Sequence, residues 1–519
     1  MGDGAVSAVP KQAFETLPGG RADARRAGLD ALEARLREDL ERLCLPAPDW
    51  LARPADDEAL DVAIVGGGMS GLAAAAALWL LGVHRIRVFD RSPAGEAGPW
   101  VTHARMETLR SPKHLTGPAL GLPSLTFRAW YEAQHGRDRW DALDRIPRVM
   151  WQAYLDWFRT VLGLPVSHDT RIDAIGPARL GDGTLAVGFD ARAGDGPRRV
   201  VERIRARHLV LATGMDGLGG PAIPDVARSL PRERWQHSTE RIDFAALRGR
   251  RLGVVGGGDS ALDAAATALE AGAAEVLVFV RAKDFARINY WKAFAHPGHY
   301  IGFPELPVRD RQPILDFLKA QKVPPARGTV HRLAAFDSVR LHFNSPVIAA
   351  TVADGPGATP AVRLRTPHGE YPVDHVVFAT GYRTDPSMRP ELAELAPHIR
   401  FWSERGPDVS AGFPLEGFPD LEEDFSLRAR DPAACSVLAQ VHLFTGAALM
   451  SLGKLTGDIP GISHGTDRLA RGIAARLYAA DRENQLRAVR SYDELEVRGD
   501  EWARIRVDHP SSEGDDTPG

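Results

Sequence analysis

Two glycine-rich turns carry the clearest chemistry in this 519-residue chain. The first is GGGMSG at residues 66–71, and the second is GGGDSA at residues 256–261. Each turn follows a short β-branched run and precedes a helical pattern of small residues. The first glycine permits a tight bend, the second lets the backbone approach a pyrophosphate, and the third small residue lets helix and strand pack. Two dinucleotide-binding βαβ units are therefore predicted.

The residues that end the second strand of each unit predict different nucleotides. Asp90 stands about twenty residues after the first turn, where a carboxylate accepts hydrogen bonds from a ribose diol. Arg281 takes the corresponding place in the second unit, and Lys283 is close enough to share its role. A guanidinium pairs with a 2′-phosphate that a carboxylate would repel. The second site is therefore predicted to select NADPH over NADH.

Two apolar runs end in the same tripeptide, in RHLVLATGM from Arg207 and in DHVVFATGY from Asp374. In flavoproteins with two dinucleotide sites, such strands mark the crossings between a flavin domain and a nicotinamide domain. The expected fold class is α/β, with two Rossmann-like, three-layer domains and the NADPH domain inserted into the FAD domain. The predicted bounds are 1–58 for an N-terminal helical extension, 59–215 and 383–506 for the FAD domain, 216–382 for the NADPH domain and 507–519 for a disordered tail.

The N-terminal extension contains ARRAGLDALEARLREDLERL, a pattern typical of an amphipathic helix. Its apolar stripe consists of Leu29, Leu32, Leu36, Leu40 and Leu43. We expect this helix to pack on the main body or on a partner subunit. The last residues, VDHPSSEGDDTPG, are polar and acidic, which is typical of disorder.

Taken together, GGGMSGL with Asp90, GGGDSAL with Arg281 and the two ATG strands resemble the class B flavoprotein monooxygenases. That family includes flavin-containing, N-hydroxylating and Baeyer–Villiger monooxygenases, and the resemblance covers roughly residues 59–480. It implies FAD and NADPH as cofactors. NADPH would reduce the flavin, O2 would form a C4a-hydroperoxyflavin, and a small nucleophilic substrate would take the distal oxygen.

Two further segments resemble substrate-contacting parts of the ornithine and lysine N-hydroxylases. METLRSPKHLTGPALGLPSLTFRAWY contains Lys113, which the resemblance implies binds a substrate carboxylate or the flavin. ARINYWKAFAHPGHY contains Asn289 at the place of a substrate-contacting asparagine, although Tyr290 replaces the family's glutamate. Lys113 and Asn289 are the predicted catalytic residues, and N-hydroxylation of an amine or amino acid is the predicted reaction. Solvent-exposed or loop roles for both residues remain open.

The alternatives are Baeyer–Villiger or sulfide oxygenation and an NADPH-dependent flavin reductase that does not activate oxygen. TGDIPGI places Asp458 at the start of a long helical pattern, where a helix N-terminus stabilises reduced flavin. The predicted cofactor-binding residues are Gly66, Gly68, Met69, Ser70, Gly71, Asp90, Arg91, Trp100, Gly214, Gly256, Gly258, Asp259, Ser260, Arg281, Thr380, Gly381, Tyr382 and Asp458. No metal site is expected, because His296 and His299 have no third ligand at suitable spacing.

Composition excludes several other classes of protein. The formal net charge of -4 gives no basic surplus for nucleic acid. Only two cysteines, Cys44 and Cys435, occur, and they form no C-x-x-C pair, which fits a reducing compartment and a cytoplasmic location. The longest apolar run, residues 71–83, is too short to cross a bilayer. We expect a small-molecule substrate and O2, no nucleic acid or membrane partner, and leave a homo-oligomer open.

Overall fold

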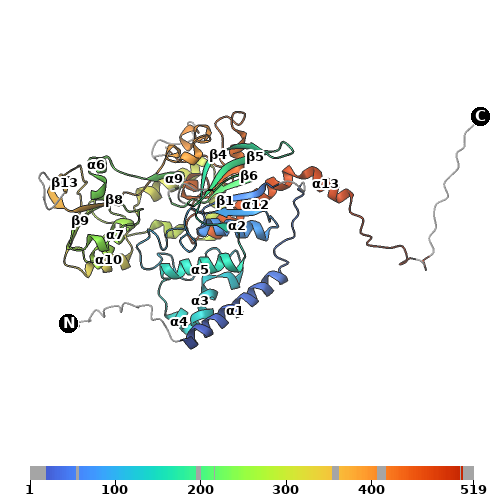
Figure 1. Cartoon of the computed structure of the whole chain (residues 1–519), viewed down its shortest axis with the longest axis horizontal. Coiled ribbons are helices and arrows are strands. Elements are labelled where there is room, and N and C mark those ends of the chain that lie inside the picture. The colour runs from blue at the N-terminus through green and yellow to red at the C-terminus, as the bar shows by residue number, and fades with distance from the viewer. Residues whose placement is uncertain are drawn as a thin grey trace, which may run out of the picture.

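The computed structural model describes residues 19–53, 58–194, 200–215, 217–352, 362–405, 417–502 and 504–505. Two sheets, a larger mixed one and a smaller parallel one, dominate the described part of the chain, and each is the centre of a separate layered domain (Figure 1). The predicted tail at 507–519 lies outside the described residues.

The larger sheet has the strand order β3-β2-β1-β6-β5-β4, and β17 also pairs with β6. Its strands are β1 (Leu60–Val65), β2 (Ile86–Phe89), β3 (Val166–Ser167), β4 (Thr170–Arg179), β5 (Leu185–Ala193), β6 (Val200–Leu211) and β17 (Val441–Leu443). Strands β3, β2, β1, β6 and β17 are parallel, while β5 and β4 form an antiparallel flap. Helices α2 (Met69–Leu80) and α12 (Ile462–Ala480) pack against each other beside this sheet.

The second sheet has the order β11-β10-β9-β15-β8, and all of its neighbouring strands are parallel. Its strands are β8 (Trp235–His237), β9 (Arg251–Val255), β10 (Glu275–Phe279), β11 (Val339–His342) and β15 (His375–Phe378). Helices α7 (Asp259–Glu270) and α10 (Arg327–Ala334) supply side chains to one apolar cluster. A meander of β12 (Ala349–Val352), β13 (Val362–Thr366) and β14 (Gly369–Val373) supplies a second cluster.

Chain order confirms that the second domain is inserted into the first. The larger sheet takes β1 to β6 from before the insertion and β17 from after it. The two connections meet in a short antiparallel ladder of β7 (Gly219–Pro221) and β16 (Tyr382–Thr384). This ladder lies beside the crossings expected near Met215 and Tyr382. The residue bounds of each domain stay a prediction.

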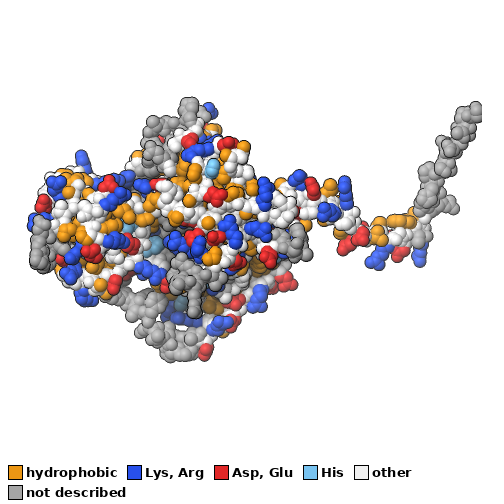
Figure 2. Space-filling model, turned by 45° about the horizontal axis from the view of Figure 1, so that its top comes forward, with side chains coloured by type: hydrophobic (Ala, Val, Ile, Leu, Met, Phe, Trp, Pro, Cys, Tyr) orange, Lys and Arg blue, Asp and Glu red, His pale blue; other side chains and the backbone are white. Residues whose placement is uncertain are grey.

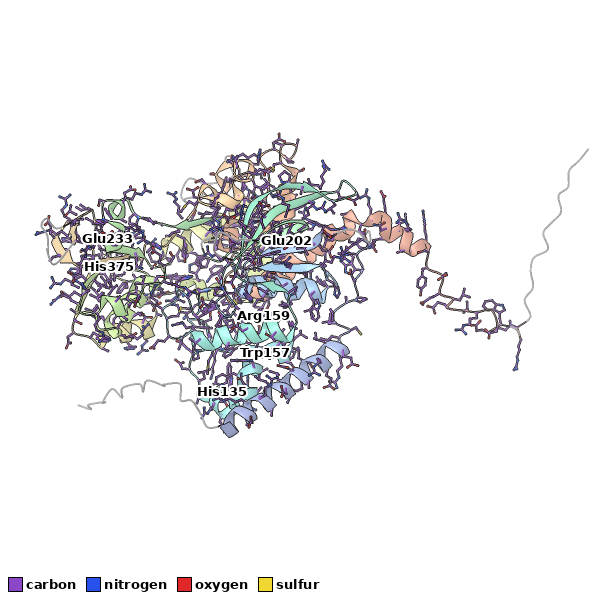
Figure 3. The ribbon with its side chains drawn as sticks, in the orientation of Figure 1. His135, Trp157, Arg159, Glu202, Glu233 and His375 are labelled. Carbon is purple, nitrogen blue, oxygen red and sulfur yellow. The ribbon has the colours of Figure 1, made fainter. Side chains whose placement is uncertain are left out.

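Helix α1 (Gly19–Arg42) packs against α3 (Phe127–His135) below the larger domain (Figure 1). Its Leu32 and Leu36 are almost fully buried. The helices approach so closely at Gly28 that an added Cβ would lie 1.9 Å from the Ala133 carbonyl oxygen. On the neighbouring helix α5 (Arg148–Val161), the Trp157 indole points toward α1 and donates to Glu33 at 3.2 Å (Figure 3). The extension is thus tied to the body of its own chain.

One residue of the predicted apolar stripe differs from the rest. Leu43 follows the last residue of α1 and is exposed, because the helix ends at Arg42 and Cys44 adopts a positive φ of 53°.

At the other end of the chain, α13 (Arg482–Arg490) leads away from the body, and the following residues expose large apolar side chains (Figure 2). No helix among the described residues is long and apolar enough to span a membrane.

Candidate dinucleotide and active site

The first glycine turn joins β1 to α2 and permits only glycine at two places. Gly66 has a φ of +108°, and a Cβ there would lie 2.3 Å from the Ala212 carbonyl oxygen. A Cβ at Gly71 would lie 1.8 Å from the Gly66 carbonyl oxygen. Helix α2 therefore starts directly against the turn, and its first N–H groups are available to an anion. Met69 is buried and Ser70 half-buried in this first helical turn.

Asp90 follows β2 and is buried beside this turn. Its Oδ2 accepts the Gly67 N–H at 2.6 Å, and its Oδ1 accepts the Ser92 N–H at 2.7 Å. These two donors fix the carboxylate and leave further lone pairs on both oxygens for ribose hydroxyls. The geometry therefore fits a ribose ligand. Arg91, which was also predicted to contact the cofactor, is exposed.

Trp100 provides an independent test of whether a flavin nucleotide fits here. Its indole N–H is buried and has no hydrogen-bond partner among the described residues. The ring lies next to Gly98, whose Cα approaches Gly68 in the first turn. Trp151 meets Trp100 edge to face at 6.3 Å, and its indole N–H is likewise buried and unpaired. Buried donors normally have acceptors, so the Trp100 N–H beside the turn fits a polar edge of a bound FAD, whereas Trp151 is fully buried among protein rings.

The start of α12 also approaches the loop after β2, which carries Trp100 and Gly117. The Ser463 hydroxyl donates to the Gly117 carbonyl at 2.5 Å. Gly461, the N-cap residue of α12, offers no side-chain cap, so the first N–H groups of the helix remain available. Asp458 instead pairs with Lys454 at 2.7 Å. The helix terminus, more than the Asp458 carboxylate, has the polarity that stabilises negative charge on a flavin.

The second glycine turn joins β9 to α7 and repeats the first in backbone geometry. Gly256 has a φ of +148°, and a Cβ there would lie 2.4 Å from the Ala379 carbonyl oxygen. Gly258 differs, because nothing lies within 4 Å of the place where its Cβ would be. Gly258 and Ser260 are exposed, so this turn is open to a ligand from solvent.

Arg281 lies two residues after β10 and is exposed. It forms no ion pair within the described part of the chain, whereas neighbouring Arg287 pairs with Asp284 at 2.9 Å. Val280, which precedes Arg281, lies against Gly257 of the glycine turn. An uncommitted guanidinium beside the turn is suited to a phosphate on the ribose.

The two ATG segments lie at the connections between the domains. Gly214 and Gly381 have positive φ angles of 88° and 84°. The Thr380 hydroxyl donates to the Ala222 carbonyl at 2.6 Å and lies 3.4 Å from His237 Nε2. Tyr382 begins β16 and is partly exposed. These residues connect the domains, and their contact with a cofactor stays a prediction.

The two predicted catalytic residues make local contacts and are not brought together by any contact found in the structure. Lys113 Nζ donates to the carbonyls of Trp140 at 2.6 Å and Asp141 at 3.1 Å, and lies 5.0 Å from the Trp140 ring centroid. The Asn289 side chain accepts the Trp291 N–H at 3.2 Å and caps a short 3-10 turn. Both contacts are structural, so a substrate role for either residue stays a prediction.

Two arginines of the loop that carries Lys113 were not predicted from the sequence as functional residues. Arg105 donates to the carbonyls of Ser238 at 2.5 Å and Glu240 at 2.7 Å, in the inserted domain. Arg110 reaches two aspartates of α7. Their partners lie more than 100 residues later in the chain, so no local spacing could have indicated them.

The described residues contain no group of three or more His, Cys, Asp or Glu side chains placed to hold a metal ion. His296 and His299, the pair considered from the sequence, have ring centroids 6.4 Å apart. His296 Nδ1 accepts the His299 N–H at 3.3 Å and so caps α8 (Pro297–Gly302). The contact accounts for the His-Pro-Gly-His spacing.

Two Rossmann-like domains, one inserted into the other and each with a glycine turn, define the class of flavoproteins with two dinucleotide sites. A family model described as FAD-NAD(P)-binding matches residues 63–216. A model described as L-lysine 6-monooxygenase/L-ornithine 5-monooxygenase matches residues 141–325. An FAD-dependent urate hydroxylase from Xanthomonas campestris pv. campestris is 38% identical over 481 residues, covering 91% of this chain and 98% of that protein.

Solved structures show the same fold. Ornithine hydroxylase (PvdA) from Pseudomonas aeruginosa has a TM-score of 0.61 at 17% identity and covers 81% of this chain and 100% of its own. L-lysine 6-monooxygenase from Pseudomonas syringae has a TM-score of 0.60 at 20% identity, and the match covers 80% of this chain and 99% of that one. The chain belongs to the class B flavoprotein monooxygenase family, as its motifs predicted, and is an oxidoreductase that uses FAD and NADPH.

Proposed function

We propose that this enzyme hydroxylates urate or a closely related oxidised purine, with FAD and NADPH as cofactors. The observation that carries the proposal is the 38% identity with an FAD-dependent urate hydroxylase over 98% of that protein's length. The lysine and ornithine hydroxylases of known structure share only 17–20% identity with this chain. At that level a likeness supports the fold but not the substrate.

The residues on which the amine prediction rests have other partners. Lys113 is held by two backbone carbonyls, and Asn289 caps its own turn. Tyr290, which replaces the expected glutamate, packs edge to face on Phe317 at 5.2 Å. A carboxylate that could bind an amino group is therefore absent from that position. These observations favour a substrate that is not a cationic amine.

Two arginines, Arg105 in the loop between β2 and α3 and Arg148 at the start of α5, favour an anionic substrate. Urate is a monoanion at neutral pH, and half-buried cations without carboxylate partners attract anions. Arg105 contacts backbone carbonyls, and Arg148 donates to the Trp100 carbonyl; neither forms an ion pair within the described ranges. Burial lowers the pKa of Arg105 to about 10, so this side chain stays protonated at neutral pH. We place the substrate near this loop.

The protein residues have distinct tasks in this reaction. The first turn, Asp90 and the Trp100 indole would hold FAD, and the second turn with Arg281 would hold NADPH. Bound FAD supplies the transfer of two electrons from NADPH to dioxygen. Arg105 and Arg148 would orient the purine, while the buried indoles of Trp100 and Trp151 exclude water. One oxygen atom enters a purine carbon, the other leaves as water, and one NADPH and one proton are consumed.

The experiment supplies the purified, FAD-loaded enzyme with NADPH and, separately, urate, xanthine, L-ornithine, L-lysine, a sulfide and a cyclic ketone. The expected result is loss of urate absorbance in proportion to NADPH consumed, with little hydrogen peroxide. Catalase and a reaction without NADPH are the controls. Coupling to L-ornithine or L-lysine, but not to urate, would overturn the proposal.

N-hydroxylation of an amine is the second candidate, because the lysine and ornithine monooxygenase model matches residues 141–325. In that case Lys113 would have to leave the Trp140 and Asp141 carbonyls to reach a substrate carboxylate. Lys113→Ala distinguishes the candidates. It should leave the KM for urate unchanged within about twofold if the lysine only anchors the loop. A large rise in the KM for an amino acid would support the second candidate.

A further inference from the structure

A single arginine from the flavin-side loop contacts the helix that follows the second glycine turn. Arg110 lies between β2 and α3, and α7 begins at Asp259. Arg110 Nη2 lies 2.5 Å from Asp263 Oδ2, and its Nε lies 3.1 Å from Asp259 Oδ2. The guanidinium thus spans both domains.

The two aspartates are one helical turn apart on the same face of α7, where like charges repel. Asp263 is buried and also accepts the Thr329 hydroxyl at 2.7 Å. Asp259 accepts the Ala326 N–H at 3.0 Å, and burial raises its pKa. Arg332 lies 3.6 Å from Asp263 and pairs more closely with Glu270, at 2.8 Å. Arg110 is therefore the cation that faces both carboxylates.

Asp259 directly follows the exposed Gly258, at the place where a dinucleotide pyrophosphate meets the helix N-terminus. A carboxylate there favours the helix dipole but repels the pyrophosphate. A cation beside Asp259 Oδ2 offsets that repulsion. The cation comes from the loop that carries Trp100, so the same contact also sets how far α7 lies from the flavin side.

We propose that Arg110 is a positioning residue for NADPH: it compensates Asp259 beside the pyrophosphate and holds α7 in register with the flavin-side loop. This inference deepens the dinucleotide site and does not depend on which substrate is hydroxylated. NADP+ binding and anaerobic flavin reduction need no hydroxylation substrate. Failure of the urate proposal would therefore leave the following test intact.

The test compares Arg110→Ala with Arg241→Ala in the FAD-loaded enzyme. Arg241 pairs with Glu96 across the same interface, but this exposed pair does not touch α7. Arg110→Ala should raise the Kd for NADP+, measured by calorimetry, about tenfold and slow anaerobic flavin reduction by NADPH. Arg241→Ala should change both quantities less than about twofold. Equal, small changes in the two variants would overturn the proposal.

A second-site variant separates charge compensation from fold stability. Asp259→Asn added to Arg110→Ala removes the repelling charge and should restore most of the NADP+ affinity, whereas the flavin reduction rate should stay slow. No recovery of affinity would contradict compensation of Asp259. If Arg110→Ala does not fold, Arg110→Lys keeps the charge but loses the two-pronged contact. It should bind NADP+ nearly normally and reduce flavin slowly; a normal reduction rate would contradict positioning.

Discussion

The two glycine turns share a backbone and differ in their surroundings. In each, the first glycine has a positive φ and lies against the alanine carbonyl of an ATG segment, Ala212 in one and Ala379 in the other. Around the first turn, α2 is buried on nearly all sides, and Asp90 is held by two N–H groups. Around the second turn, Gly258, Ser260 and Arg281 are exposed.

We propose that this difference reflects different tasks for the two nucleotides. An enclosed turn with a fixed carboxylate suits a cofactor that stays bound, whereas an open turn with an exposed guanidinium suits one that binds and leaves in each cycle. The backbone provides a pyrophosphate cradle in both cases. We expect exposure and the charge at the end of the second strand to determine which nucleotide binds and how easily it exchanges.

The largest expected effects come from adding one methyl group to each turn. Gly66→Ala strains a left-handed residue by about 1–3 kcal/mol, and its Cβ would also collide with Ala212. The purified variant should carry little or no FAD. Gly256→Ala, whose Cβ would collide with Ala379, should retain FAD but lose measurable NADP+ binding. Flavin absorbance per protein and calorimetry check the pair, and loss of FAD from the second variant would contradict independent roles.

The next effect concerns the charge at the second turn. Arg281→Ala should raise the KM for NADPH about tenfold and leave the KM for NADH and kcat nearly unchanged, because only NADPH has the 2′-phosphate. Arg287→Ala is the matched control, since Arg287 is exposed but already paired with Asp284. An unchanged NADPH preference in Arg281→Ala would remove this assignment.

A smaller effect is expected at the first turn. Asp90→Asn keeps the size of the side chain but weakens its contacts with Gly67, Ser92 and the ribose. The rate of FAD loss on dilution should rise about fivefold, because the combined weakening of these hydrogen bonds amounts to about 1 kcal/mol. The KM for NADPH should not change. A change in NADPH affinity with normal FAD retention would reverse the assignment of the two turns.

The smallest effect concerns pH and the inserted domain. Burial, followed by the charges of Arg234 and Arg232, lowers the pKa of His375 from 6.5 to about 4. As pH falls from 6.5 toward 4, the unfolded chain takes up this proton before the folded one, so the free energy of unfolding decreases, by about 2 kcal/mol. His375→Gln should flatten this decrease, whereas His331→Gln at an exposed position should not. Identical pH profiles for all three proteins would contradict the prediction.

The geometry of the two glycine turns could be predicted from the sequence, because their residues act on nearby backbone. Gly66, Gly256 and Asp90 lie in positions that their spacing predicts, and the ATG strands indicated the insertion. Arg105 and Arg110 were not singled out, because their partners are brought near only by the packing of two domains. Lys113 resembles a substrate ligand in sequence, yet α4 (Arg137–Ala142) supplies carbonyls that no motif around Lys113 encodes. Contacts between domains can be identified only once the fold is known.

Urate hydroxylation is tested most directly by one reaction under isotope-labelled dioxygen, with purified FAD-loaded enzyme, NADPH and urate. We expect one labelled oxygen atom to enter the purine product for each NADPH oxidised, and NADPH oxidation to accelerate when urate is added. Unlabelled urate recovered intact, with all consumed dioxygen released as hydrogen peroxide, would contradict urate hydroxylation.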